Sequence, residues 1–293
     1  MTPRRPTAAD LVELVRLPAV LSVPGDALAG AAASGWPAGR RTAVAPAAAS
    51  CLYLAGMALN DYSDRELDAH ERPERPIPSG RVTPGTALAL AGGLTGAGLL
   101  LATGLGRRGF GVAAALAATV WTYDLVAKPT PLGPAVMGLA RGLDVMLGAC
   151  GDRAAVPTAL ATGAHTVAVT ALARGEVHGS SPVVAWSAVA TTAGVAGATV
   201  AGSLVGDHRP SWPDRAVTAG FAALYGVTVG RAQVAAAASP DAVTVRSATR
   251  TGIGGLLPLQ AAQLAAAAAP AVGLVLVAAA PLLRSLARRV ATT

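Results

Sequence analysis

Long apolar segments separated by short polar connections run along most of this 293-residue chain. Residues 82–106, 154–173, 177–206 and 251–283 contain no Asp, Glu, Lys or Arg. About 20 apolar residues in a helix cross the ~30 Å hydrocarbon core of a bilayer, so each segment is long enough to span a membrane. The pattern predicts nine spanning helices, at 11–33, 41–60, 84–106, 109–127, 133–150, 155–174, 182–205, 215–235 and 255–283.

Composition favours helices as the spanning elements. Hydrophobic residues make up 53% of the chain and charged residues only 13%, and the mean hydropathy is +0.50. The 34 glycines and many alanines suit close helix contacts, where small side chains let backbones approach. We therefore expect an all-α, polytopic integral membrane protein that forms a single domain over residues 1–293 and lies in a bacterial plasma membrane.

The net charge of +7 does not indicate a nucleic-acid partner. The arginines are dispersed at the ends of the apolar segments, where they can meet lipid headgroups, and the sequence has no basic stripe with interleaved aromatic residues. The expected surroundings are therefore a lipid bilayer, with no nucleic acid bound.

One polar stretch, at residues 60–81, holds more than a third of the sixteen acidic residues. Three of its carboxylates, Asp61, Asp64 and Asp68, follow an apolar segment at spacings i, i+3 and i+7, which places them on one face of a continuing helix. Like charges stacked in this way repel one another and favour a bound cation. With Asn60 they offer an oxygen-rich surface that suits Mg²⁺ and, through the metal, a phosphorylated substrate.

The second half of this stretch is basic and rich in proline. Arg72, Arg75 and Arg81 carry planar guanidinium groups that can hold phosphate oxygens. Three prolines between residues 73 and 78 predict a stiff, extended segment that does not continue the helix. We expect carboxylates, metal and arginines to converge on a diphosphate. The alternative is a solvated loop whose Asp and Arg side chains pair at the surface.

These residues resemble the first aspartate-rich motif of the UbiA superfamily of intramembrane prenyltransferases. The match comprises Asn60-Asp61-x-x-Asp64-x-x-x-Asp68 followed by Arg72-Pro73-x-Arg75-Pro76-Ile77-Pro78-Ser79-Gly80. The nine-span layout, with polar loops after the second and sixth spans, is also similar to that family. The resemblance implies a helical bundle around a central cavity in which Mg²⁺ holds a prenyl diphosphate.

The resemblance also implies roles for individual residues. Tyr123 and Lys128, near the end of the fourth span, are similar to a Tyr and a Lys at the diphosphate in the family. Alternatively, Tyr123 belongs to an interfacial aromatic belt and Lys128 reaches the headgroups from a helix end. The first motif supplies the expected metal ligands and catalytic residues Asp61, Asp64 and Asp68, and the expected substrate-binding residues Asn60, Arg72 and Arg75.

The chain departs from the family at the loop after the sixth span. Family members usually carry a second aspartate-rich motif there, but residues 173–179 read Ala-Arg-Gly-Glu-Val-His-Gly. We expect Glu176 to bind a second Mg²⁺ through one oxygen, or Arg174 and His178 to replace part of that charge by contacting phosphate. The alternative is a short turn with an ion pair at a helix end.

Three ionisable residues inside predicted spans are expected to face the bundle interior, because charge facing lipid is costly. Arg141 and Asp144, three residues apart, either neutralise each other or contact substrate, while Asp26 has no local partner and is expected to face the cavity. His165 is expected to be a hydrogen-bonded packing residue. The aromatic candidates for stabilising a cation are Trp121, Tyr123, Trp186 and Tyr225.

The leading hypothesis is an enzyme that transfers a prenyl group from its diphosphate to a lipophilic or aromatic acceptor in the membrane. Mg²⁺ and arginines would stabilise the departing diphosphate, and apolar walls would keep water from the cation-like allylic carbon. A membrane phosphotransferase is disfavoured because its Asp-Gly-x-x-Ala-Arg pattern does not occur. The alternative is a non-catalytic protein of this fold that binds or passes a prenyl lipid within a larger assembly, which the altered loop at Glu176 would fit.

Overall fold

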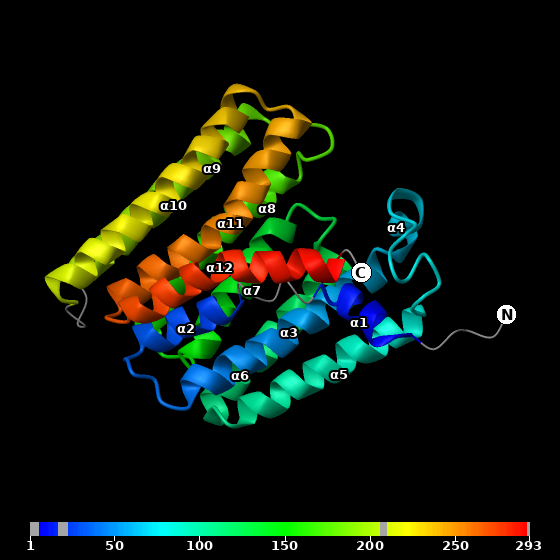
Figure 1. Ribbon diagram of the computed structural model, residues 1–293, viewed down its shortest axis with the longest axis horizontal. Helices are drawn as coiled ribbons and strands as arrows, with labels where there is room; N and C mark the ends of the chain where they lie inside the picture. The colour runs from blue at the N-terminus through cyan, green and yellow to red at the C-terminus, as the bar shows by residue number, and fades with distance from the viewer. Residues whose placement is uncertain (1–5, 17–22, 206–209, 292–293) are drawn as a thin grey trace.

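The computed structural model describes residues 6–16, 23–205 and 210–291, and the regular secondary structure in these ranges is helical (Figure 1). Two short helices, α1 (Ala8–Leu14) and α4 (Arg65–Glu71), accompany the long ones. The expected all-α class is confirmed. The longer helices are α2 (Val23–Ala33), α3 (Arg41–Ser63), α5 (Pro84–Thr103), α6 (Gly106–Thr122), α7 (Gly133–Gly148), α8 (Val156–Ala173), α9 (Pro182–Val205), α10 (Trp212–Ala238), α11 (Ala242–Ala266) and α12 (Pro270–Ala291).

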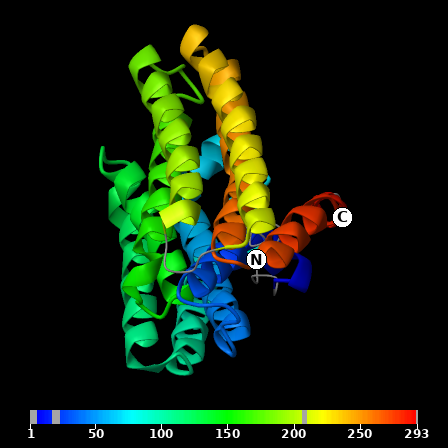
Figure 2. The same cartoon turned by 90° about the vertical axis from the view of Figure 1, so that its left-hand side faces the viewer.

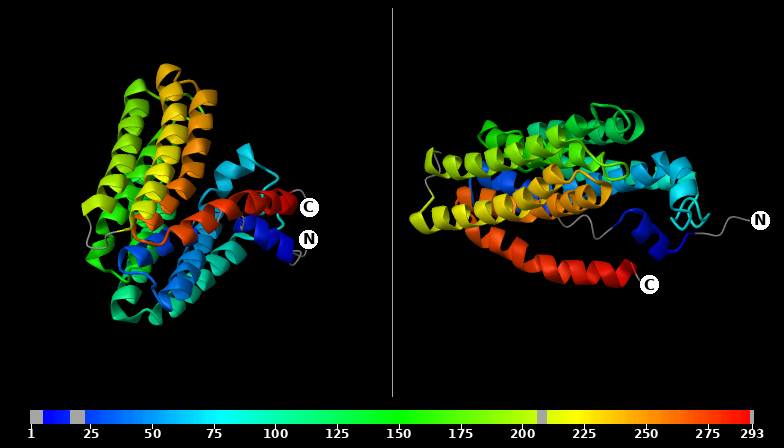
Figure 3. Two further views of the ribbon diagram at one scale, coloured as in Figure 1. Left: turned by 60° about the vertical axis from the view of Figure 1, so that its left-hand side comes forward. Right: turned by 90° about the horizontal axis from the view of Figure 1, so that it is seen from above.

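The long helices form a bundle that closes on itself. Helices next to each other in the chain pack side by side, and α11 returns to pack on α2 and α8. Helix α7 is surrounded by several other helices, since it contacts α2, α3, α6 and α8. Helix α12 packs on α11 but leans away from the other helices, as Figures 2 and 3 show.

Five helical segments of the described chain are long and apolar enough to cross a membrane. They are Arg41–Ser63, Pro84–Thr103, Gly106–Ala127, Arg153–Ala173 and Pro182–Val205. Each coincides, within a few residues, with one of the predicted spans. The count of nine spans is approximate, since several remaining helices are shorter or carry more charge.

The last predicted span, 255–283, is not one helix. Helix α11 already begins at Ala242 and ends at Ala266, and α12 begins at Pro270, with Ala268 at φ +58° between them. The predicted start at residue 255 is wrong, since Arg246 and Arg250, which precede it, lie exposed within α11. The first predicted span, 11–33, includes residues 17–22, which lie outside the described residues together with Arg4, Arg5 and Arg209.

Polar side chains at the helix starts define several boundaries. Thr83 Oγ1 accepts from Thr86 N at 3.2 Å, with Pro84 as the first residue of α5. Asp241 Oδ1 accepts from the amides of Val243 and Thr244, both at 3.0 Å, at the start of α11. Hydrogen bonds from Thr244, through its hydroxyl and its amide, lower the pKa of the Asp241 carboxyl.

Glycines let α2 and α7 pack backbone against backbone. A Cβ added to Gly148 would lie 1.8 Å from Ala27 O, and one added to Gly30 would lie 1.8 Å from Val145 O. Any side chain at either position would therefore push the two helices apart. This confirms the expectation that small residues serve close helix contacts, and it sets the spacing at which charged residues of α2 and α7 meet.

Candidate functional site

The three aspartates of the first polar loop lie at the junction of α3 and α4, where α4 projects beyond the bundle (Figure 1). The amide of Asp64 donates to Asn60 O at 2.9 Å, and the amide of Asp68 donates to Asp64 O at 2.8 Å. The chain therefore keeps a helical path across the junction. Asp61 and Asp68 are only 4% and 2% exposed, so their charges require compensation by nearby cations.

Asp61 and Asp68 share one guanidinium group. Arg75 Nη1 lies 2.5 Å from Asp68 Oδ2 and 3.6 Å from Asp61 Oδ1. Arg16, which follows α1, places Nη2 2.5 Å from Asp61 Oδ1, and Arg72 Nη1 lies 3.9 Å from Asp68 Oδ1. The structure thus brings together four of the predicted residues, Asp61, Asp68, Arg72 and Arg75. A fifth residue, Arg16, was not predicted as part of the site.

The proline-rich segment reaches the aspartates because it folds back. Its expected extended conformation is wrong, since Ser79 N donates to Arg75 O at 3.0 Å and Val82 N donates to Pro76 O at 2.9 Å. Gly80 adopts φ +74°, a left-handed conformation that glycine tolerates without a steric penalty. These successive turns return the Arg75 side chain to the carboxylates of the preceding helices.

Asp64 faces a different cation, Lys128, with which it forms an ion pair. Lys128 follows a π-helical turn, Tyr123–Ala127, in which Lys128 N donates to Tyr123 O at 2.9 Å. A π turn closes over one residue more than an α turn, so Lys128 stands over Tyr123 instead of being rotated away from it. Both predicted residues therefore lie at the aspartate end of the bundle.

A cavity of about 130 Å³ lies beside the aspartates, between α3, α6 and α7. Asn60 and Tyr123 line the end near Asp64, and Arg141 and Asp144 line the deeper end. Aliphatic side chains of the three helices form most of the remaining wall. The three aspartates and their cations do not belong to the lining, so the mouth lies next to the charged loop, while the interior is apolar and the floor is polar. This agrees with the expected cavity in a helical bundle.

Asp124 is a site residue that the sequence analysis missed. It lines the cavity, is 7% exposed, and its Oδ1 accepts from Asn60 Nδ2 at 3.1 Å. The hydrogen bond fixes the amide of Asn60 at the mouth of the cavity. A carboxylate inside an otherwise apolar span was the available signal.

The floor of the cavity is a buried ion cluster. Arg141 Nη2 lies 2.6 Å from Asp26 Oδ2 and Arg141 Nη1 lies 4.0 Å from Asp144 Oδ2. Asp26 Oδ1 also accepts from Gln260 Nε2 at 2.7 Å. The main partner of Arg141 is therefore Asp26, from a distant helix. Asp26 has no local partner, as expected, but it pairs with Arg141 behind the cavity and is not part of the cavity lining.

The second polar loop lies at the same end of the bundle, and its Arg174 side chain binds backbone. Arg174 Nη2 donates to Lys128 O at 3.2 Å and to Thr130 O. Arg246 Nη2 donates to Glu176 O at 2.9 Å. The Glu176 carboxylate forms no hydrogen bond or ion pair with the described residues, and no contact joins it to the three aspartates.

Arg81 points away from the aspartates. Its Nη1 lies 2.6 Å from Glu13 Oε2 and 3.0 Å from Asp10 Oδ1, so it fastens α1 to the first polar loop. Hydrogen bonding to Glu13 raises the pKa of the Arg81 guanidinium despite partial burial. The expected phosphate contact of Arg81 is therefore replaced by a structural one.

Of the four aromatic candidates, Tyr123 lines the cavity. Trp121 Nε1 donates to Thr95 Oγ1 at 3.1 Å, and Trp186 is 54% exposed. Tyr225 is fully buried, with its hydroxyl 2.9 Å from His165 Nδ1, while His165 Nε2 lies 3.1 Å from Gly252 O. The expectation of a hydrogen-bonded packing histidine is confirmed.

The aspartates fit a divalent cation in donor chemistry. They offer the hard oxygen ligands that Mg²⁺ takes, and Asp61 and Asp68 already converge on one positive group, Arg75 Nη1. Within the described ranges, no three His, Cys, Asp or Glu side chains are arranged to hold a metal ion, because Asp64 turns toward Lys128. A metal held by all three carboxylates would require Lys128 or Arg75 to move.

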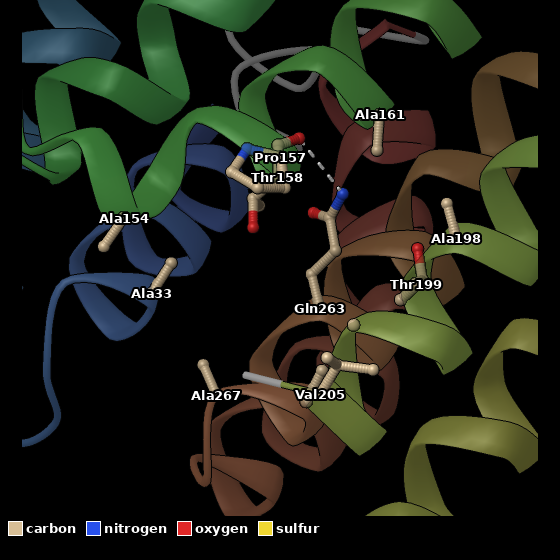
Figure 4. A pocket seen from close by; sticks show the side chains of 12 residues that line it. Ala33, Ala154, Pro157, Thr158, Ala161, Ala198, Thr199, Val205, Gln263 and Ala267 are labelled. Carbon is tan, nitrogen blue, oxygen red and sulfur yellow. Dashed lines mark hydrogen bonds between the residues drawn. The ribbon is translucent and has the colours of Figure 1, made fainter. Parts of the chain in front are cut away.

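A larger cavity of about 430 Å³ lies between α2, α8, α9 and α11 (Figure 4). Half of its lining residues are alanine, and the amide of Gln263 is directed toward Thr158 O at 3.5 Å. No charged side chain lines it among the described residues. The smaller cavity therefore carries the site chemistry.

The sequence matches the UbiA prenyltransferase family over residues 20–230. It is 38% identical over 107 residues to digeranylgeranylglyceryl phosphate synthase of Methanopyrus kandleri, covering 36% of this chain and 38% of that one. It is 36% identical over 96 residues to 4-hydroxybenzoate octaprenyltransferase of Providencia stuartii, covering 32% and 33%. These alignments span less than half of the relatives' lengths.

Solved structures share the fold over nearly their full length. An apo structure of a UbiA homolog from Aeropyrum pernix K1 superimposes with a TM-score of 0.65 at 20% identity, covering 83% of this chain and 96% of that one. A structure described as that of digeranylgeranylglyceryl phosphate synthase gives a TM-score of 0.65 at 14% identity, covering 88% and 98%. The location of the protein in a bacterial plasma membrane stays a prediction. By the extent of the family match, this integral membrane protein belongs to the UbiA prenyltransferase family.

Proposed function

We propose that this protein is a Mg²⁺-dependent prenyltransferase that moves a prenyl group from its diphosphate to a lipophilic or aromatic acceptor in the membrane. Membership of the family supports this proposal, as do the prenyl-transfer names of its relatives. The observation that carries it is the set of carboxylate–cation pairs at the mouth of an aliphatic cavity.

The paired charges suggest how the site would accept a metal and a diphosphate together. Mg²⁺, when bound, would neutralise the diphosphate and stabilise its departure. Asp64 and Asp68 would then release Lys128 and Arg75, whose donors would turn to phosphate oxygens. The proposed metal ligands are Asp61, Asp64 and Asp68, and the proposed diphosphate-binding residues are Asn60, Arg72, Arg75, Tyr123 and Lys128. The expected roles of Glu176 at a second ion and of Arg174 at phosphate stay predictions, because Arg174 and the Glu176 backbone make backbone contacts in this structure.

The cavity would hold the reacting carbon and the acceptor. Breaking the allylic C–O bond leaves the electron pair on the diphosphate, where Arg75 and Lys128 stabilise the developing charge. The face of Tyr123, at the mouth, would stabilise the cation-like carbon. The aliphatic walls keep water away, so the acceptor nucleophile attacks instead.

The test uses purified protein in detergent with radiolabelled geranylgeranyl diphosphate, a mixture of lipid and aromatic acceptors, and Mg²⁺. We expect a labelled product and released diphosphate, both abolished by EDTA and restored by added Mg²⁺. Turnover that persists without any divalent metal would overturn the proposal. Tight retention of the prenyl compound without diphosphate release would instead favour a non-catalytic lipid-binding protein.

A further inference from the structure

A second charged cluster lies at the end of the bundle opposite the aspartates. Arg40 and Arg41 stand at the start of α3, and Arg107 and Arg108 lie in the first turn of α6. All four line one hollow of about 700 Å³, together with Asp152 from the connection between α7 and α8. Helix α3 runs for 23 residues between this hollow and the aspartates. At about 1.5 Å per residue, the two charged clusters are roughly 30 Å apart.

Close packing of the helix ends forms the hollow. Gly106 adopts φ +79°, a left-handed conformation that lets the chain turn directly from α5 into α6. The connection after α7 lies against the start of α6, since a Cβ added to Gly151 would lie 3.9 Å from Arg108 Cβ. A Cβ added to Gly109 would likewise lie 3.5 Å from Cys150 Sγ. The arginines are therefore brought together by three packed segments of the chain.

The guanidinium groups of this hollow lack compensating carboxylates. At the aspartate end, Arg16, Arg75 and Arg81 each form an ion pair. Within the described ranges, none of the four arginines of the hollow forms an ion pair or a side-chain hydrogen bond. The carboxylate in the lining, that of Asp152, accepts from Ala154 N at 3.0 Å and so caps a short helical turn. The hollow therefore carries an excess of positive charge, which favours a bound anion.

The position of the hollow places it at the surface of a bilayer. The spanning segments of α3 and α6 begin there, and that of α5 ends there. Exposed apolar side chains continue from it toward the middle of these helices. Phe110, one turn beyond Arg107 on α6, is 40% exposed, and Leu101, in the last turn of α5, is 39% exposed. A ligand with a charged head and apolar chains would contact both surfaces at once.

We propose that this hollow binds the phosphate headgroup of an anionic phospholipid. Guanidinium groups donate paired N–H groups to phosphate oxygens, and basic pockets between spanning helices suit such headgroups. The acyl chains lie along the exposed apolar side chains of α5 and α6. The bound lipid links the start of α3, the start of α6 and the connection after α7. The inference is independent of prenyl transfer, which is assigned to the opposite end of the bundle.

Net charge decides which headgroups fit. A phosphatidylglycerol headgroup brings one phosphate anion, which the arginines compensate. A phosphatidylcholine headgroup carries the same phosphate together with a quaternary ammonium group, which would lie among uncompensated guanidinium groups. Like charges repel each other more strongly where water is partly excluded. We therefore expect the hollow to prefer the anionic lipid to the zwitterionic one with the same chains.

The test uses the full chain carrying Cys51→Ser in neutral detergent, so that Cys150, which lines the hollow, is the remaining thiol. Its labelling by N-ethylmaleimide is followed while dioleoylphosphatidylglycerol or dioleoylphosphatidylcholine is added. Phosphatidylglycerol is expected to slow labelling at least fivefold. Half-maximal protection should need at least a tenfold lower concentration of phosphatidylglycerol than of phosphatidylcholine.

Two arginine variants from different helices locate the binding site. Arg41→Gln and Arg108→Gln should each raise the half-maximal concentration of phosphatidylglycerol about fivefold, the effect of one arginine near an anionic lipid surface. Arg153→Gln is the matched control, because it removes a charge at the same end of the bundle from outside the lining, and it should change this concentration less than twofold. Melting temperatures without lipid report that each variant is folded.

Three outcomes would overturn the inference. Equal protection by the two lipids would show that the arginines do not select an anionic headgroup. Equal losses in Arg108→Gln and Arg153→Gln would show general attraction to a charged surface instead of binding in the hollow. Equal protection by inorganic phosphate alone, at the same concentration, would show that the hollow takes a free anion and that the acyl chains contribute nothing.

Discussion

The two polar loops at the site end of the bundle use their charged side chains differently. In the first loop, the charged side chains form ion pairs, because Arg75 lies between Asp61 and Asp68 and Asp64 pairs with Lys128. In the second loop, Arg174 and its neighbour Arg246 bind backbone carbonyl oxygens instead. An ion pair can exchange its partner for a ligand, whereas a side chain bound to backbone holds a segment in place. The first loop is therefore suited to binding and the second to support.

The most severe test of this comparison is Asp64→Asn in the first loop. The amide cannot compensate Lys128 or bind a cation as a carboxylate does, so we expect Mg²⁺-dependent binding of geranylgeranyl diphosphate to fall at least 100-fold. Equilibrium binding with and without EDTA measures the change. Asp214→Asn, at the capped start of α10, is the matched control and should bind normally. Unchanged affinity in Asp64→Asn would show that the first loop does not bind the metal and the diphosphate.

Arg174→Ala tests support by the second loop. The variant loses the donors to Lys128 O and Thr130 O, so we expect the protein to be destabilised by about 1–3 kcal/mol, typical for hydrogen bonds from a charged group. Turnover should fall less than tenfold, through displacement of Lys128. Denaturation in detergent and steady-state kinetics report the two effects separately. A collapse of diphosphate affinity with intact stability would show that Arg174 binds substrate directly.

Arg81→Ala extends the comparison to the contact between α1 and the first loop. Its ion pairs with Asp10 and Glu13 are partly exposed and lie away from the aspartates, so we expect faster proteolysis near α1 and little change in diphosphate affinity. Limited trypsin digestion with a binding measurement checks both. A large loss of affinity would mean that α1 itself closes the site through Arg16.

Glu176→Gln should have the smallest effect. The structure holds the Glu176 backbone through Arg246, and its carboxylate makes no contact with the aspartates in the described part of the chain. If the loop is only a support, turnover should change less than threefold. A loss as large as that of Asp64→Asn, together with a higher Mg²⁺ concentration needed for half-maximal turnover, would instead establish Glu176 as a ligand of a second ion.

The sequence predicted those parts of the site that are written within short segments. The spacing of Asp61, Asp64 and Asp68 and the adjacent arginines located the charged mouth, and apolar run length located most of the spans. It did not predict that Asp64 would separate from the other two, because that depends on Lys128 from another helix. Arg16 escaped notice because its partner, Asp61, lies 45 residues away.

The buried floor shows the same limit more strongly. Arg141 and Asp144 are close in sequence, so local neutralisation was the natural prediction, yet Arg141 pairs chiefly with Asp26. That contact depends on the close approach of α2 and α7 at Gly30 and Gly148, which no local pattern reveals. Likewise, the prediction placed Arg246 between two spans although it lies within α11. An arginine that reaches solvent from a helix interrupts an apolar run in the same way as an arginine in a loop.

The π turn at Tyr123–Ala127 makes the number of residues between Tyr123 and Lys128 a property of the site. If the same residues formed a regular α turn, the turn would close one residue earlier, and every later position would rotate by about 100° around the helix axis. Lys128 would leave Asp64, and the carbonyl oxygens that hold Arg174 would move with it. One extra residue within a single turn thus keeps both polar loops connected to the site.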